Sequence, residues 1–355
     1  MKAAILGLQG SGKTTLFRAI SGKEIRPGGA TAIDEAIVQV PDERLEWLTG
    51  LYKPKKTVYG TIDCLDVPGF DFTGEHGRLI AERLLDTIRT VDLIVFVIRA
   101  FEDISVPAYR DSVDAVRDLT ELKTELLLAD LALVTTRIER LEKQASKPGK
   151  SAAEDRAELE LQKRFQAAIE AEKPISSEIK TKEELHMIKS LGFLNLKPMV
   201  VAVNVGEGDL GKKFTFEGLE QNVPVINVCA KLDLELSQLD DESRTEFMKE
   251  LGIKEPAADR FVRGCYAALG LISFLTVGTD EVRAWPIKQG TIALDAAGKV
   301  HSDIQRGFIR AETFSYADIK ELGDEKKLKA AGKIRLEGKE YIVRDGDIIN
   351  FRFNV

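Results

Sequence analysis

The sequence has few of the residues that hold small secreted or metal-binding proteins together. Among its 355 residues are three cysteines and three histidines. Cys64, Cys229 and Cys265 lie far apart in the chain, and none belongs to a CxxC or Cys/His spacing. A disulfide framework and a structural zinc site are therefore not predicted, and the cysteines are expected to be reduced and buried.

Long apolar runs and an excess of basic residues are also missing. No segment approaches the run of about 20 apolar residues that a membrane helix needs, and the first predicted strand leaves no room for a signal peptide. We therefore expect a cytoplasmic protein with no membrane attachment. The net charge of −7 disfavours broad binding to nucleic acid, and no sequence-specific DNA binding is expected. A local basic face could escape this average, so composition does not exclude a ribosome partner.

The chain does carry a phosphate-binding motif at its start. An apolar segment beginning at Ala3 runs into a Gly-rich turn, and an amphipathic segment over residues 16–20 follows. The turn matches GxxxxGK(S/T), the P-loop, in which backbone N–H groups at a helix N-terminus hold phosphates. The candidate nucleotide-binding residues here are Gly7, Gln9, Gly10, Ser11, Gly12, Lys13, Thr14 and Thr15. Lys13 is expected to reach the β- and γ-phosphates, and the Thr14 hydroxyl to bind Mg²⁺.

A second motif, DxxG, follows the next predicted strand, residues 57–66. Asp66 is expected to hold Mg²⁺ through a water molecule, and the Gly69 N–H to sense the γ-phosphate. Phe70 stands where many GTPases have the Gln that orients the attacking water, so slow hydrolysis is predicted. His76 is the candidate for placing the water instead, and a merely solvated loop histidine is the alternative.

Two further loops complete the candidate site. The Gly-rich segment 21–33 is predicted to be a switch loop in which Thr31 binds Mg²⁺, with plain loop polarity as the alternative. After the buried-strand run 197–203 comes Asn204-Val205-Gly-Glu207, where GTPases have NKxD. The missing Lys and the longer carboxylate weaken the guanine contact and make adenine plausible. Cys229-Ala230-Lys231 resembles the SAK loop that flanks the base.

The pattern of elements predicts an α/β fold in three parts. Residues 1–112 and 191–275 are assigned to a nucleotide-binding domain with a buried parallel strand over 91–99. Residues 113–190 form an inserted antiparallel helical hairpin, and residues 276–355 a small α+β domain of short strands. In the hairpin, an a/d seam is predicted from Leu127, Leu131, Val134, Ile138 and Leu141, a Lys147–Lys150 turn, and a second helix with Leu161, Phe165 and Ala168. Its charged residues are read as a solvated face, with a binding surface as the alternative.

Several stretches resemble the Obg-like ATPase (YchF-type) family of translation-associated P-loop NTPases. They are Val40–Leu45, Phe101–Asp103, Thr124–Leu131, Asn204–Glu207 and Leu239–Arg244, and, in the part similar to the family's TGS domain, Glu281–Trp285, Gly307–Glu312 and Gly346–Phe353. The resemblance implies a Ras-like domain interrupted by a coiled-coil hairpin and followed by a ubiquitin-like β-grasp (TGS) domain. It also implies ATP preferred over GTP, Mg²⁺ as cofactor, and association with ribosomes. Gly10 replaces an Asn that can help hold potassium in the family, so potassium stimulation is not carried over.

The expected function is a slow Mg²⁺-dependent ATPase that acts as a nucleotide switch, as a monomer. Lys13, Asp66, Gly69 and His76 are its candidate catalytic residues, and Thr14, Thr31 and Asp66 its candidate metal-binding residues. Two alternatives remain open at this stage. One is a GTPase of the wider Obg type, and the other is a non-catalytic regulator whose nucleotide only stabilises the fold.

Overall fold

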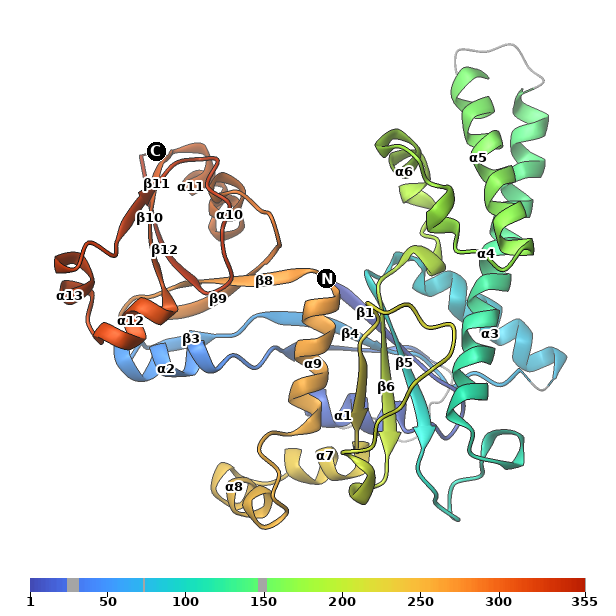
Figure 1. Ribbon diagram of the computed structural model, residues 1–355, viewed down its shortest axis with the longest axis horizontal. Coiled ribbons are helices and arrows are strands. Elements are labelled where there is room, and N and C mark those ends of the chain that lie inside the picture. Colours follow the sequence, from blue (N-terminus) through green and yellow to red (C-terminus); the bar gives the residue numbers. More distant parts are fainter. Residues whose placement is uncertain (24–31, 73, 146–151, 355) are drawn as a thin grey trace. The chain divides into compact units, whose positions relative to one another are not determined.

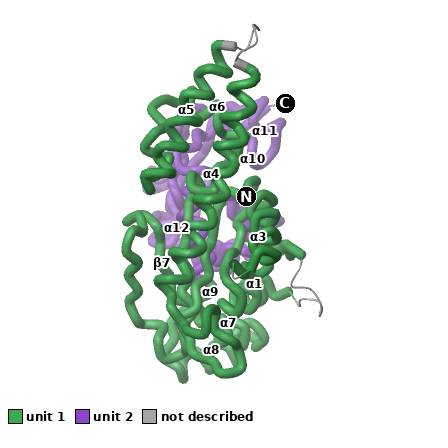
Figure 2. The backbone as a smooth tube through the Cα atoms, turned by 90° about the vertical axis from the view of Figure 1, so that its right-hand side faces the viewer, with its two compact units in different colours: residues 1–36, 64–258 green, residues 37–63, 259–355 purple. Residues whose placement is uncertain are grey.

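The computed structural model describes residues 1–23, 32–72, 74–145 and 152–354. These residues form two compact units, one of residues 1–36 and 64–258 and the other of residues 37–63 and 259–355 (Figure 2). This division differs from the predicted one, because residues 37–63 and 259–275 group with the C-terminal part of the chain. None of the helices in the described ranges is both long and apolar enough to cross a membrane.

The first unit is built on a sheet with the strand order β2-β4-β1-β5-β6-β7. The strands are β1 Lys2–Leu6, β2 Asp34–Gln39, β4 Thr61–Asp66, β5 Leu93–Ala100, β6 Met199–Val205 and β7 Val225–Val228. β1, β5, β6 and β7 pair in parallel, and β5 and β6 are almost fully buried, as expected for strands covered on both faces. The strand order reverses beside β1, where sheets of this class bind ligands at the carboxyl ends of their strands.

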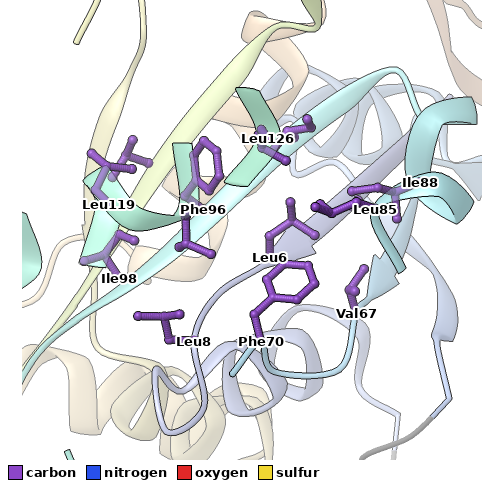
Figure 3. Close-up of a cluster of buried hydrophobic side chains, with 14 of the residues drawn as sticks. Leu6, Leu8, Val67, Phe70, Leu85, Ile88, Phe96, Ile98, Leu119 and Leu126 are labelled. Atoms are coloured by element: carbon purple, nitrogen blue, oxygen red, sulfur yellow. The ribbon is translucent and has the colours of Figure 1, made fainter. Parts of the chain in front are cut away.

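Helices cover both faces of this sheet (Figure 1). The α-helices of this unit include α1 Lys13–Ser21, α3 Glu75–Thr87, α4 Ala115–Ala145, α5 Ala152–Glu170, α6 Lys182–Ile188, α7 Ala230–Ser237 and α8 Asp241–Glu250. Of these, α5 and α6 pack with the far part of α4 in an apolar cluster of their own and do not cover the sheet. On one face, Leu85 of α3 and Leu126 of α4 pack with Phe96 in the main apolar cluster (Figure 3). On the other face, α1 and α7 contact each other. The P-loop therefore lies between a buried strand and a packed helix.

The inserted segment forms two long helices that pack side by side, α4 and α5 (Figure 1). The residues predicted for the seam are buried or half-buried, and Val134, Ile138 and Phe165 share one apolar cluster. Arg137 of α4 adds a bidentate ion pair with Glu158 of α5, with N–O distances of 2.6 and 2.8 Å. The predicted turn at 147–150 lies outside the described residues. Because the first turns of α4 pack on the main sheet, the projecting part begins later than predicted.

The second unit contains a mixed sheet with the order β11-β10-β12-β8-β9-β3. Its elements are α2 Glu43–Tyr52, β3 Lys56–Val58, β8 Leu271–Thr276, β9 Glu281–Lys288, α10 Ala293–Val300, α11 Ser302–Arg306, β10 Phe308–Ser315, α12 Tyr316–Leu322, α13 Glu325–Ala330, β11 Arg335–Glu337 and β12 Asp347–Phe353, together with α9 Ala257–Ala268 except its first two residues. The predicted short strands correspond to β9, β10, β11 and β12. β8 was not predicted, and the predicted boundary at 275/276 cuts through it.

Packing explains why residues 37–63 group with the second unit. β3 pairs in parallel with β9, and Leu48 of α2 is buried in a cluster with Val282. Arg44 donates to the carboxylates of both Asp42 and Asp345. The predicted strand over 57–66 is thus two strands, β3 and β4, which belong to different sheets. An alternating pattern shows that residues are extended, but it does not show which sheet they join.

Candidate nucleotide-binding site

The P-loop has a conformation that depends on glycine at several positions. Gly10 and Gly12 have φ angles of 75° and 84°, in the left-handed region, and α1 begins directly after Gly12. A Cβ on Gly7 would lie 2.6 Å from both the Ser11 hydroxyl and the Val97 carbonyl oxygen. The backbone can therefore curve tightly at the start of α1, where N–H groups are free to bind phosphate.

Lys13, Thr14 and Asp66 come together although 52 residues separate the latter two in sequence. The Thr14 hydroxyl donates to Asp66 Oδ2 at 2.8 Å. Lys13 is only 8% exposed; burial lowers the pKa of its amine, and the charge of Asp66 opposes that shift. A buried cation at the mouth of a P-loop favours a polyanionic ligand, which would replace the lost hydration.

The Asp66 carboxylate is suited to a divalent cation. It is 7% exposed, and its Oδ1 atom has no hydrogen-bond partner among the described residues. Burial raises its pKa, against the opposing effects of the Thr14 hydroxyl and of Lys13. A hydroxyl beside an unsatisfied carboxylate fits Mg²⁺, which takes oxygen ligands and binds to proteins through few of them. The described residues contain no group of three or more His, Cys, Asp or Glu side chains that could hold a metal alone, so phosphate oxygens would complete the shell.

The second motif lies directly against the P-loop. The Phe70 N–H donates to the Gly7 carbonyl at 3.1 Å, and the Gln9 N–H donates to the Phe70 carbonyl at 3.2 Å. A Cβ on Gly69 would lie 3.0 Å from Lys13 Nζ and 3.1 Å from Gln9 Cα. Only glycine gives the backbone this approach, so the Gly69 main chain lies beside the lysine that would hold the terminal phosphates.

We call the P-loop backbone together with Lys13, Thr14, Asp66 and Gly69 the cradle. The side chain of Phe70 points away from it. Its side chain is 2% exposed, stacks on Phe72 with a centroid distance of 5.6 Å, and packs against Leu8 and Val67 (Figure 3). At the position where many GTPases have a catalytic Gln, the structure thus has an apolar anchor. The Phe70 side chain fixes the DxxG segment to the core, and it has no group that could orient water.

Asn204 joins the P-loop to the candidate base loops. Its Nδ2 donates to the Ser11 carbonyl at 2.9 Å, and its Oδ1 accepts from the Ala230 N–H at 3.0 Å. A Cβ on Gly12 would lie only 2.1 Å from Asn204 Nδ2. Both ends of the buried amide are used in holding loops, so Asn204 ties the P-loop to the first turn of α7.

The other predicted residues are distributed around this centre. Val205 is buried in the apolar cluster of the sheet, and Glu207 is exposed in a short 3-10 helix, Glu207–Asp209. Cys229 caps α7, and burial raises the pKa of its thiol. Thr15 is half-buried in α1 and Lys231 is exposed in α7.

The structure describes one of the two remaining predicted residues. His76 is exposed in the first turn of α3. Thr31 lies outside the described residues, so its predicted part in the site stays a prediction.

Comparison with known proteins agrees with this geometry. Residues 2–137 match a family model described as a 50S ribosome-binding GTPase. Residues 271–354 match the model of the C-terminal domain of YchF-type GTPases, described as a protein of unknown function.

Similarity also extends over the full chain. It is 40% identical to the protein of Bacillus subtilis named ribosome-binding ATPase YchF, covering 100% of both chains. The chain belongs to the YchF/Obg-like ATPase family. Obg-like ATPase 1 of Caenorhabditis elegans is 33% identical, covering 100% of this chain and 92% of the relative. The solved structure of the Schizosaccharomyces pombe YchF GTPase is similar with a TM-score of 0.84 and 31% identity, covering 99% of this chain and 97% of that one.

Arg99 is a buried charged residue near the P-loop that the sequence did not single out. Arg99, near the end of β5, is buried and donates to main-chain carbonyls of the loop that follows. The sequence does show an arginine at the end of an otherwise apolar strand. A charged side chain is tolerated in such a buried place only if it is hydrogen-bonded.

Proposed function

We propose that this chain is a slow, Mg²⁺-dependent ATPase that acts as a nucleotide switch on the ribosome. The observation that supports it most directly is the contact of Thr14 with Asp66 beside the buried Lys13, between a glycine P-loop and the Gly69 backbone. This is the set of groups that phosphoryl transfer by P-loop proteins requires. Full-length relatives named ribosome-binding ATPases give the context.

In this proposal the P-loop amides and Lys13 hold the phosphates, while Thr14 and Asp66 hold the metal, Asp66 through water. Bound Mg²⁺ would neutralise charge on the phosphate oxygens. The Gly69 N–H is proposed to bind the terminal phosphate, so that its loss after hydrolysis releases the second switch. Thr31 is proposed to do the same for the first switch.

Hydrolysis is proposed to be slow because the chain lacks the residue that usually orients the water. Phe70 occupies that position and packs into the core. His76 is our candidate for placing the water, from the exposed first turn of α3. A switch with slow intrinsic turnover stays in its ATP form until a partner accelerates it.

ATP is proposed to be preferred over GTP. In NKxD proteins the Asp carboxylate accepts from guanine, and here the longer Glu207 stands at that position, with the buried Val205 in place of the Lys. Asn204 uses both ends of its amide on the loops. A GTPase remains the second candidate, because both matching family models and the Schizosaccharomyces pombe relative are named as GTPases.

The ribosome is the proposed partner, which would place the protein in the cytoplasm. We expect a monomer to cosediment with ribosomes of its source organism more strongly in a non-hydrolysable ATP analogue than in ADP. Lys13→Ala, tested in parallel, should lose the difference between the two nucleotides. Sedimentation that is equal in both nucleotides, or absent in both, would contradict the ribosome part of the proposal. It would leave nucleotide hydrolysis to be judged separately.

A further inference from the structure

Arg99 is a buried cation whose hydrogen bonds all shape one loop. It is 4% exposed and lies next to the last residue of β5. Its guanidinium donates to the main-chain carbonyls of Phe101, Asp103, Val106 and Pro107, at 3.1, 3.3, 3.0 and 3.1 Å. It also lies over the Phe101 ring, 4.6 Å from its centroid. We name residues 101–107 the wall segment.

Only arginine suits this arrangement. A buried charge is tolerated when its hydrogen bonds are satisfied, and here carbonyl dipoles spread over seven residues satisfy them. The guanidinium has five N–H donors in a rigid plane, whereas lysine has one ammonium on a flexible stem. A lysine at this position could not hold both ends of the wall segment at once.

The wall segment borders the P-loop at two points. A Cβ on Gly10 would lie 3.1 Å from Val106 Cγ1, 3.2 Å from the Pro107 carbonyl oxygen and 3.5 Å from Arg99 Nη1. A Cβ on Gly12 would lie 3.8 Å from Phe101 Cε1, on the side where Asn204 meets the P-loop. Phe101 is thus placed near the junction of the phosphate cradle and the base loops.

Asn204 connects this side of the P-loop to the loop that begins at Cys229, through its hydrogen bonds to Ser11 and Ala230. The pKa of Asp103 is lowered mainly by hydrogen bonds from Ser105, and the charges of Arg99 and Lys231 lower it further. Lys231 follows Ala230, whose N–H is bound by Asn204. The wall segment and Asn204 therefore meet the P-loop at the same residue, Gly12, and the hydrogen bonds of Arg99 fix the shape of the wall segment.

We propose that Arg99 is a positioning residue for the nucleoside end of the bound nucleotide. It acts through the wall segment and touches no reacting atom. In the proposed function the phosphates are held by Lys13 and the α1 amides. The hydrogen bonds of Arg99 go to carbonyls of the wall segment and not to these groups. Loss of Arg99 should therefore weaken binding of the nucleoside more than binding of the phosphates. This inference rests on the proposed nucleotide binding at the cradle.

The test compares two ligands that share phosphates but not a nucleoside. Affinities of Arg99→Lys for ATP and for inorganic tripolyphosphate, both with Mg²⁺, are measured by calorimetry on the full chain. We expect ATP to bind about tenfold more weakly and tripolyphosphate to change by no more than about twofold. An equal loss for both ligands, or no loss for either, would overturn the proposal.

Further variants guard against a folding defect in Arg99→Lys. Phe101→Leu removes the ring from a half-buried site and should show the same selective loss for ATP. If Arg99 acts through Phe101, the double variant should bind ATP only slightly less tightly than the single variant with the lower ATP affinity. Fully additive losses of binding free energy would count against the proposal. Arg117→Lys is the matched control, because Arg117 also holds loop carbonyls, those of Tyr109 and Ser112. It should leave the ratio of the two affinities unchanged.

The measurement also separates this inference from the proposed function. Calorimetry measures affinity and not turnover. An unchanged ratio of the ATP and tripolyphosphate affinities in Arg99→Lys would therefore overturn the inference and leave the proposed ATPase activity untouched. A wild-type chain that binds tripolyphosphate but not ATP would overturn both.

Discussion

Replacing Lys13 with alanine is expected to lower ATP affinity and turnover by on the order of a hundredfold or more. Lys13 is the buried cation of the cradle, beside Asp66 and the Gly69 backbone. Without it, the terminal phosphates lose their principal counter-charge while the Asp66 carboxylate remains. Calorimetry with Mg²⁺-ATP and a phosphate-release assay would measure the two effects.

Lys23→Ala is the matched control for charge. Lys23 is exposed just beyond α1, where its ammonium donates to the Glu35 carbonyl. Its loss should leave both quantities near the wild-type values. The Lys13 variant should also retain its cooperative unfolding, because removing a buried amine whose pKa is lowered by burial removes a desolvation cost. Undiminished ATP binding by Lys13→Ala would refute the phosphate assignment.

Gly12→Ala should have the second largest effect. The new Cβ would lie 2.1 Å from Asn204 Nδ2, at a φ of 84° that alanine adopts only with strain. Asn204 would have to give up its bonds to Ser11 and Ala230, or the P-loop would have to open. We expect a loss of about 2 to 4 kcal/mol in the free energy of unfolding, from strain and two hydrogen bonds, together with at least tenfold weaker ATP binding.

Gly22→Ala separates the clash from the backbone strain. Gly22 ends α1 with a φ of 63°, and a Cβ there would meet no atom of the described residues within 4 Å. This control should lose about 1 to 2 kcal/mol of stability, since an L-residue is strained in the left-handed region, and should bind ATP normally. If Gly12→Ala behaves like Gly22→Ala, Asn204 does not couple the P-loop to the base loops.

Much of the nucleotide site could be predicted because its motifs are local. Gly7 to Thr14 and Asp66 to Gly69 each follow a strand, and the carboxyl ends of adjacent strands meet at one edge of a sheet. The structure indeed joins Thr14 to Asp66. Asn204 could be expected to steady the loops, and its two hydrogen bonds show how it does so.

Other features depend on tertiary packing, which a single sequence does not show. In the sequence, Arg99 is only a charged residue at the end of a strand. Its carbonyl partners lie several residues further along the chain, and only the structure shows them. Phe70 could be recognised as replacing a Gln, but not as a core residue stacked on Phe72. Residues 37–63 have ordinary strand and helix patterns, and it is tertiary contacts, such as the pairing of β3 with β9 and of Arg44 with Asp345, that assign them to the second unit.

We have proposed that this cradle binds and slowly hydrolyses ATP. Multiple-turnover phosphate release from ATP and from GTP, side by side with Mg²⁺ and then with excess chelator, tests it most directly. We predict slow release from ATP that needs Mg²⁺, exceeds release from GTP and disappears in Lys13→Ala. Release from ATP no greater than that of Lys13→Ala, or a preference for GTP of about tenfold or more, would contradict it.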